Sequence, residues 1–312
     1  MSRYDNKYGI DIKTYCAKHA CLDCKYFDNQ HFVEINKNCP LLELKNAVLI
    51  DGFMQAFTTK TPLSVVSKAD DENVLKIVNL SGGKDSTALL LMLLELGVKI
   101  DYIVFADTGK DFPQMRDHLF KLSDHIKNKY PLAPKITVLK DENSFDYYMF
   151  DHIKTRGKNI GKCGYGWATM FARWCTTKLK TSLMNKFCNS LGKDYINYIG
   201  IAADEPKRLH KDPHRAYPLA DWGITENQAL KYCYACGFDW GGLYERFDRV
   251  SCWCCPFKNL KELKALWKYY PELWAELKIM DARANNRFRA DYSVAELEQK
   301  FIKEEAADNG GN

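Results

Sequence analysis

The sequence lacks any stretch that would carry it into or through a membrane. Its first residues, Met1 to Lys7, contain no apolar run, so we expect no signal peptide. The most apolar stretch, residues 88–106, is interrupted by Glu95, Lys99 and Asp101 and is too polar to span a bilayer. The sequence therefore predicts a cytoplasmic protein with no membrane partner.

Two common nucleotide-binding signatures are also missing. The chain contains no Gly-x-x-x-x-Gly-Lys followed by Ser or Thr, and no Gly-x-Gly-x-x-Gly follows an expected strand. Any nucleotide must therefore be held by a different kind of loop. The chain also contains no internal repeat and no low-complexity stretch, apart from a short polar tail at 306–312.

What is present is the composition of an ordinary globular protein, with 312 residues, 46% hydrophobic and 27% charged. The net charge of +5 suits an anionic substrate but is too small to indicate nucleic-acid binding by itself. Twelve cysteines are numerous for a cytoplasmic protein, where disulfides are rare. They indicate metal ligands or reactive thiols.

One short segment organises the rest of the chain. A β-rich run at 75–80 is followed at once by Ser-Gly-Gly-Lys-Asp-Ser and then by an apolar helical run at 87–96. Two glycines let the backbone approach a ligand, and the helix start offers N–H groups to an anion. A tight turn alone would explain the glycines but not the polar residues after them. We therefore predict a phosphate-binding loop made of Ser81, Gly82, Gly83, Lys84, Asp85, Ser86 and Thr87.

Strand and helix patterns alternate through the middle of the chain. After the loop they continue as a strand at 101–106, a helix at 113–129 and a strand at 135–139. This alternation predicts an α/β fold with a mostly parallel sheet covered by helices. Ligands in such sheets bind beyond the carboxyl ends of the strands, where the strand order reverses. Asp107 follows one such end and is expected either to hold magnesium or ribose or to cap the next turn.

Residues 81–86 resemble the pyrophosphate-binding loop of the N-type ATP pyrophosphatases. This group contains the phosphoadenosine phosphosulfate (PAPS) reductases, the small subunit of sulfate adenylyltransferase and the DNA phosphorothioation protein DndC. The segment Phe105-Ala-Asp-Thr-Gly109 with Pro113 resembles the second motif of the PAPS reductase family. The resemblance implies a doubly wound α/β domain of the adenine nucleotide alpha hydrolase type, with helices on both faces.

The resemblance covers about residues 75–258. The expected domain organisation is a Cys-rich module and linker at 1–74, the loop-bearing domain at 75–258 and a helical extension at 259–312. Within that extension, the apolar spacing predicts amphipathic helices at 262–287 and 294–303.

The resemblance also implies roles for residues further along the domain. Arg173 and Lys178 are expected to bind anions, and Cys175 is expected to be a metal ligand. A basic, solvated helix face is the alternative for this segment. A later segment matches the family at Gly200, Asp204, Glu205 and Arg208, whereas Ala202 stands where the family has arginine. That change removes an expected anion contact and disfavours a sulfonucleotide substrate, while ATP use is unaffected.

Cysteines cluster near the start and near residue 252. Four early ones are spaced so that their thiolates could converge on one tetrahedral metal, with free buried thiols as the alternative: Cys16, Cys21, Cys24 and Cys39. Three late ones indicate a metal or iron–sulfur centre: Cys252, Cys254 and Cys255. The resemblance assigns Cys175, Cys252 and Cys255 to one centre and leaves the fourth ligand open among Cys163, Cys236 and Cys254. Sulfur ligation alone does not separate zinc from iron–sulfur.

A glycine-rich, basic and aromatic stretch at 154–167 predicts a mobile lid over the site. Contact with nucleic acid is the alternative, because bases stack on Tyr and Trp while Lys and Arg meet phosphates.

Together these features predict an enzyme that cleaves ATP to AMP and pyrophosphate and adenylates an acceptor. Lys84 and Arg208 are expected to neutralise developing charge, Asp85 and Asp107 to lie at the catalytic centre, and Mg²⁺ to join the phosphates. The acceptor is expected to be an anionic small molecule or a nucleic acid. A cysteine-bound iron–sulfur or zinc centre would serve sulfur transfer from a protein sulfur donor.

Two other functions stay open at this point. Thiol-dependent reduction of a sulfonucleotide is one, but PAPS reductases typically carry a Glu-Cys-Gly-(Ile or Leu)-His tail, which the sequence lacks. They also tend to lose an intact Ser-Gly-Gly-Lys-Asp-Ser. The second is an accessory subunit that binds ATP or nucleic acid without turnover, and the complete loop argues against it.

Overall fold

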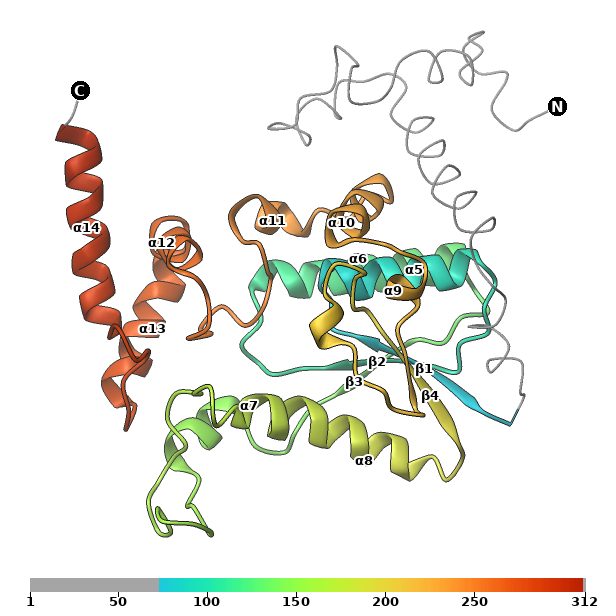
Figure 1. The fold of residues 1–312 in the computed structure, drawn as a ribbon, viewed down its shortest axis with the longest axis horizontal. Coiled ribbons are helices and arrows are strands. Elements are labelled where there is room, and N and C mark those ends of the chain that lie inside the picture. Colours follow the sequence, from blue (N-terminus) through green and yellow to red (C-terminus); the bar gives the residue numbers. More distant parts are fainter. Residues whose placement is uncertain (1–72, 311–312) are drawn as a thin grey trace, which may run out of the picture. The chain divides into compact units, whose positions relative to one another are not determined.

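The computed structural model describes residues 73–310 (Figure 1). The predicted site of Cys16, Cys21, Cys24 and Cys39 lies outside these residues. Of the described residues, 73–233 and 238–310 belong to one compact unit, which contains the loop and the cysteines near residue 252.

Five strands form one sheet in the order β3-β2-β1-β4-β5, and every neighbouring pair is parallel. The strands are β1 (Leu75–Leu80), β2 (Tyr102–Ala106), β3 (Ile136–Leu139), β4 (Tyr195–Ile199) and β5 (Arg215–Ala216). The chain moves outward from β1 to β3 and then returns to the other side of β1 for β4. The strand order therefore reverses between β1 and β4, and a ligand is expected beyond the carboxyl ends of these two strands.

Helices cover both faces of this sheet, which confirms the predicted α/β fold. Figure 1 shows α5 (Lys84–Glu95) and α6 (Pro113–Lys129) on one face and α8 (Ser182–Ser190) on the other. Ile77 and Val104 form a buried cluster with Cys188 of α8. Helix α5 is buried along most of its length, which explains why its second and third turns are an unbroken apolar run.

The remaining α-helices of the described residues lie directly before α8 and after β4 in the sequence. They are α7 (Trp174–Thr176), α9 (Pro218–Asp221), α10 (Glu226–Ala235), α11 (Leu243–Arg246), α12 (Leu260–Tyr269), α13 (Pro271–Arg283) and α14 (Val294–Gly310). The prediction of a single helix at 262–287 is wrong. The helical region is interrupted at Tyr270, whose φ of −135° is not helical. Pro271, which follows, restricts the backbone of Tyr270 and begins a new helix. Among residues 73–310, no helix is both long and apolar enough to cross a membrane.

Candidate functional site

The predicted phosphate loop lies between β1 and α5, at the carboxyl end of β1 beside β4, where the strand order reverses. Gly82 has a φ of +77°, which only glycine adopts without strain, and Gly83 is the extended N-cap residue of α5. The hydroxyl groups of Ser81 and Ser86 lie 2.9 Å apart, and the Ser86 hydroxyl also accepts the Ser81 N–H at 3.1 Å. These bonds close the loop and direct the first turn of α5 outward from the sheet edge.

Gly200, at the end of β4, sets how closely the two segments approach. A Cβ atom at this position would lie 2.7 Å from both the backbone N and the Cα of Ser86, closer than such atoms pack. We expect Gly200→Ala to displace the first turn of α5, because backbone atoms cannot move aside as a side chain can. Calorimetric titration should show ATP binding at least about 10-fold weaker, together with a loss of about 1–3 kcal/mol of stability.

The matched control for this prediction is Gly97→Ala. Gly97 has a φ of +68° but no neighbour within 4 Å of an added Cβ, so its replacement strains the backbone without touching the loop. It should lose stability and keep its affinity for ATP. Equal losses of affinity in the two variants would contradict the role assigned to Gly200.

Lys84 is buried at the centre of the loop, with 6% of its surface exposed. Its ammonium group lies 2.8 Å from Glu226 and 3.0 Å from Asp85. Burial lowers the pKa of Lys84, but the two carboxylates outweigh this effect and the pKa is raised. Burial also raises the pKa of Asp85, against the opposing charge of Lys84. The loop thus holds a charged lysine between two carboxylates at the expected phosphate position.

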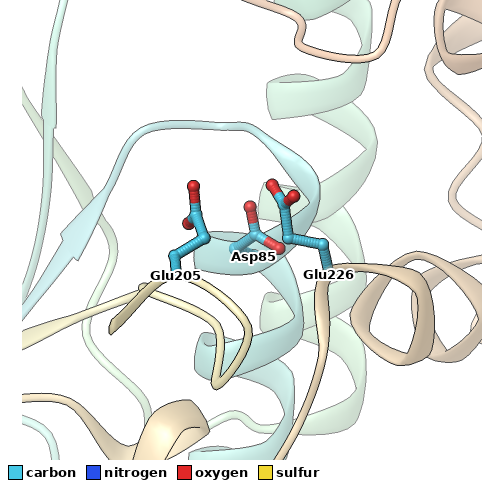
Figure 2. A group of neighbouring side chains, drawn as sticks. All are labelled: Asp85, Glu205 and Glu226. Carbon is cyan, nitrogen blue, oxygen red and sulfur yellow. The ribbon is translucent and has the colours of Figure 1, made fainter. Parts of the chain in front are cut away.

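Three carboxylates converge beside this lysine. Figure 2 shows Asp85 from α5, Glu205 from the loop after β4 and Glu226 from the first turn of α10 turned toward one another. One oxygen of each lies within 4.8 Å of the others, and the second oxygen of Asp85 is buried without a hydrogen-bond partner. Carboxylate oxygens are the ligands that Mg²⁺ prefers, so the three side chains fit a divalent cation as well as they fit Lys84.

Neighbouring groups position these carboxylates. Glu205 accepts hydrogen bonds from Arg208, at 2.6 Å, and from Arg249. Asp204 accepts the backbone N–H of Glu226 at 3.0 Å, which joins the start of α10 to the loop after β4. The predicted residues Asp204, Glu205 and Arg208 therefore lie together beside the phosphate loop.

Two aromatic side chains that the sequence did not single out hold the loop backbone. The indole N–H of Trp240 donates to the Gly82 carbonyl at 2.8 Å, and the Tyr244 hydroxyl accepts the backbone N–H of Lys84 at 2.7 Å. Trp240 has a φ of +51°, which is strained for so bulky a residue, and Gly241 and Gly242 follow it with positive φ values. This unusual turn delivers both aromatic groups to the loop.

His118 of α6 contacts both the first helical turn after the loop, at Thr87, and the ring of Trp240. Its Nε2 lies 3.1 Å from the Thr87 hydroxyl, and its ring stacks on Trp240 with centroids 4.5 Å apart. Burial, with a smaller contribution from Lys121, lowers the pKa of His118 to about 3. The imidazole is therefore neutral in the folded protein at physiological pH.

This depressed pKa predicts a pH dependence of stability. Between pH 6.5 and about 3 the unfolded chain binds a proton at His118 that the folded chain does not bind. The free energy of unfolding should therefore fall as the pH falls through this window, by about 1.4 kcal/mol per unit from this residue. In urea unfolding between pH 4.5 and 6.5, His118→Gln should have a shallower slope than the wild type. The exposed His210→Gln should keep the wild-type slope, and an unchanged slope in His118→Gln would contradict this assignment.

Asp107 caps its own turn, which was one of the two expectations for it. Its Oδ1 accepts the Gly109 N–H at 2.7 Å. The same carboxylate lines a mostly apolar cavity of about 290 Å³ at the carboxyl end of β2, together with Phe105, Phe112 and Met115. Its contact with magnesium or ribose stays a prediction.

A second cavity, of about 280 Å³, brings the late cysteines together with α7. Its lining includes Cys175, Cys252, Cys254 and Cys255. Burial raises the pKa of Cys175, Cys252, Cys254 and Cys255. Arg173 and Lys180 also line the cavity, and the pKa of Lys180 is raised chiefly by its interaction with Cys252. Cationic groups thus face the thiols.

The four thiols of this cavity could hold a zinc ion or an iron–sulfur cluster. Four-coordinate zinc with Zn–S bonds of about 2.3 Å holds its sulfur ligands about 3.8 Å apart. In the part of the chain that the structure describes, no three cysteine sulfurs lie within 4.8 Å of one another. An iron–sulfur cluster is the larger of the two groups and would occupy the space between its thiolate ligands.

The other candidates for the cysteine site lie elsewhere. Cys163 is exposed, and its backbone carbonyl accepts a hydrogen bond from Asn285. Cys236 is half-buried and directly follows the last residue of α10. Cys254 is therefore the candidate fourth ligand that the structure places in the cavity.

The two residues expected to bind anions, Arg173 and Lys178, contact different parts of the structure. Arg173 lies over the Phe257 ring, 4.6 Å from its centroid, at the cysteine cavity. Lys178 instead lies over the ring of Tyr148, with its ammonium 6.0 Å from the centroid. A π-helical turn at Thr177–Thr181 turns Lys180, not Lys178, toward the cavity.

The segment expected to be a lid is anchored at its C-terminal end. The Trp167 backbone N–H donates to Asn286 at 2.6 Å, and its indole N–H donates to Asp281 at 2.9 Å. Gly164 packs so tightly on residues 149 and 150 that a Cβ would lie 2.3 Å from a backbone oxygen. Residues 154–163 are mostly exposed, and the movement of this part as a lid stays a prediction.

Comparison with known proteins gives matches over this same region. The sequence matches the family described as phosphoadenosine phosphosulfate reductase domain over residues 76–258, more than half of the chain. It is 28% identical over 212 residues to the uncharacterised protein MJ0066 of Methanocaldococcus jannaschii, covering 64% of this chain and 39% of that protein. It is 28% identical over 176 residues to the nin region protein ORF290 of Escherichia phage lambda, covering 50% of this chain and 58% of that protein. The chain therefore spans less than two thirds of the length of either relative.

Two solved structures are also similar. One is the PAPS reductase from Candida auris in a phosphate complex, with 17% identity, a TM-score of 0.43, and coverage of 65% of this chain and 94% of that one. The other is the U34-tRNA thiolase NcsA from Methanococcus maripaludis with its 4Fe–4S cluster, with 15% identity and a TM-score of 0.40. That match covers 82% of this chain and 80% of the thiolase.

Proposed function

Because the chain belongs to the phosphoadenosine phosphosulfate reductase domain family, we propose that it is an enzyme that cleaves ATP between the α and β phosphates and transfers AMP to an acceptor. The observation that carries the proposal is the glycine loop with Lys84, set beside three carboxylates where the strand order reverses. A loop of this kind suits the two outer phosphates of ATP, since helix-start amides and an ammonium group both favour anions.

In the proposed mechanism, the β and γ phosphates lie on the first turn of α5. Lys84 exchanges the carboxylates of Asp85 and Glu226 for phosphate oxygens and stabilises the charge that develops on the bridging oxygen. An acceptor oxygen forms a bond to the α-phosphorus while the bond from that phosphorus to the bridging oxygen breaks. Pyrophosphate leaves with the bonding electron pair, and AMP stays on the acceptor.

Asp85, Glu205 and Glu226 are the residues that would hold Mg²⁺. When bound, the ion would neutralise charge on the phosphate oxygens. Once Lys84 turns to the phosphates, the three carboxylates lose their counter-ion, so a divalent cation would restore the charge balance there. Arg208 stays within reach of the same phosphates through its contact with Glu205.

Tyr244 stands where a phosphate oxygen would bind. Its hydroxyl oxygen accepts the backbone N–H of Lys84 at 2.7 Å, and this N–H belongs to the first turn of α5, where a phosphate oxygen would bind. Binding of ATP would displace this hydroxyl or turn it toward the phosphate as a donor. Tyr244 and Trp240 would thereby keep the loop in its binding shape while it is empty.

The cysteine cavity supports a second half-reaction. Cys175, Cys252, Cys254 and Cys255 would hold an iron–sulfur cluster, which when bound would supply a site for activating sulfur. A sulfur nucleophile of the hydrosulfide class, delivered by a protein sulfur donor, then forms a bond to the adenylated acceptor and AMP leaves. Arg173 and Lys180 would balance the negative charge of thiolates and sulfur in the cavity. Cys16, Cys21, Cys24 and Cys39 stay a predicted second metal site.

The test uses ATP labelled on the α-phosphate, Mg²⁺ and a panel of acceptors comprising tRNA, single-stranded DNA and sulfate. The expected result is labelled adenylate on one of the acceptors, which is released as labelled AMP when hydrosulfide is added. Release of labelled ADP, or no turnover with any member of the panel, would contradict the proposal. A parallel assay for sulfite release from PAPS with a thiol donor tests the reductase alternative.

A further inference from the structure

One continuous segment of the chain carries a large excess of positive charge. Residues 152–193, called here the acid-free segment, contain nine Lys or Arg side chains and no Asp or Glu. The remaining residues hold 36 Lys or Arg against all 40 Asp or Glu, so the rest of the chain is net acidic. The modest net charge of the whole protein therefore conceals a local basic surface, which favours a polyanionic partner.

The acid-free segment also displays apolar side chains to solvent. Thr169 and Ala172 exchange backbone hydrogen bonds of 3.2 and 3.1 Å, which close a tight turn with Met170 and Phe171 at its tip. Met170 is 79% exposed and Phe171 is fully exposed. Turn tips usually carry Gly, Asn, Asp, Pro or Ser. Two large apolar side chains at this tip suit the faces of nucleic-acid bases, and Arg287 and Arg289 line the same surface cavity.

This tip lies at the entrance to the cysteine site. Met170 and Phe171 line a surface cavity of about 570 Å³ with Ala168, Pro256 and Phe257, and these last three residues also line the cysteine cavity. Arg173 stacks on Phe257 at this shared wall, 4.6 Å from the ring centroid. A base held at the tip would therefore lie next to the thiols.

We propose that the acceptor is a base of a single-stranded nucleic acid that docks on the acid-free segment. This inference rests on the proposed function, whose acceptor it specifies. The phosphates contact cations such as Arg156, Lys158 and Lys162, while unpaired bases stack on Phe171 and Met170. A duplex does not fit this surface as well, because its bases are already stacked on one another and hide their faces from the tip.

The experiment measures binding of fluorescent single-stranded RNA and DNA of about 20 nucleotides to the full chain by anisotropy, without ATP. Met170→Ser/Phe171→Ser should weaken binding at least about 10-fold, within the range for loss of base stacking. Arg156→Glu/Lys158→Glu should reduce the slope of log affinity against log salt by about 1.4, the value for two phosphate contacts on a single strand. The ratio of RNA to DNA affinity identifies which polymer is preferred.

Leu132→Ser is the matched control for the tip, because Leu132 is a fully exposed apolar residue outside the acid-free segment. It should bind as the wild type does. Inorganic polyphosphate, which has charge but no bases, should bind more weakly than RNA or DNA of similar charge and should be insensitive to the tip variant. Equal binding of wild type and tip variant, or failure to bind either single strand at about 100 mM salt, would overturn the proposal.

The two proposals fail in different ways. Binding that depends on the tip, without formation of AMP, would support the docking surface and contradict the adenylation. Formation of AMP with a small acid, without nucleic-acid binding, would support the adenylation and overturn the docking surface.

Discussion

Replacing Lys84 with methionine is expected to lower the rate of AMP formation by about 100-fold to 1,000-fold, the usual cost of removing one group that stabilises transition-state charge. Lys84 is the cation that the loop presents to the phosphates, and methionine keeps most of its length without the charge. The loss should fall on kcat, measured with saturating ATP and labelled α-phosphate, because the interaction strengthens as charge develops on the leaving pyrophosphate.

Lys110→Met is a close structural match for this variant. Lys110 is as buried as Lys84, at 6% exposed, and its ammonium also contacts two carboxylates, Glu276 at 2.8 Å and Asp146 at 3.1 Å. Both variants should lose stability, because each leaves two carboxylates without their partner. Only Lys84→Met should lose activity beyond what its thermal stability explains. Equal activity losses in the two variants would indicate a structural role for Lys84.

The second large effect is expected at the cysteine cavity. Cys252→Ser should remove most of the iron and visible absorption from anaerobically purified protein, because serine is a poor ligand for an iron–sulfur centre. Sulfur transfer to the acceptor should fall at least about 100-fold. Formation of pyrophosphate and of the adenylated acceptor should stay within about 3-fold of the wild type, because the phosphate loop belongs to a separate set of contacts.

Cys188→Ser controls for loss of a buried thiol. Cys188 lies on α8 and packs against Ile77 and Val104 of the sheet, with its sulfur 3.9 Å from the Asn197 side chain. This variant should keep its iron and its sulfur transfer while losing some stability. Full iron content in Cys252→Ser, or loss of iron in Cys188→Ser, would contradict the assignment of the cavity. Colourless wild-type protein that contains zinc would contradict the choice of cluster.

The sheet and the loop could be predicted because their signals are local. The run at 75–80, the two glycines and the apolar run after Thr87 specify a strand, a turn and a buried helix from neighbouring residues alone. Parallel order follows from the alternation of strand and helix patterns. The carboxyl ends of β1 and β4 then lie together as a consequence of topology, which brings Glu205 to Asp85.

The rest of the site depends on contacts between distant parts of the sequence. Glu226 contacts Lys84 across 142 residues, and Trp240 and Tyr244 reach the loop across about 160. Each is an ordinary helix or turn residue in its own neighbourhood. One local signal is available for Glu226: the Thr225 hydroxyl accepts the Gln228 N–H at 3.3 Å and caps the start of α10, and a capped helix start fixes the position of the residue after it.

The cysteine site has some residues that the sequence could predict and others that it could not. The spacing of Cys252 and Cys255 indicated a centre, and Cys175 joined it through the resemblance. The selection of Lys180 over Lys178 could not be foreseen, because it depends on a single π-helical turn that rotates the helix face between them. A sequence with ideal helix geometry would have directed different cations to the cavity.

The measurement closest to the central claim is the ³¹P spectrum of ATP consumed by the wild-type protein with Mg²⁺ and its acceptor. If the loop at 81–86 binds the two outer phosphates, the spectrum should gain pyrophosphate and an equal amount of adenylate, either bonded to the acceptor or, once hydrosulfide is added, as free AMP. Growth of orthophosphate and ADP instead would show that the bond broken is the outer one, and that the loop does not hold the leaving group.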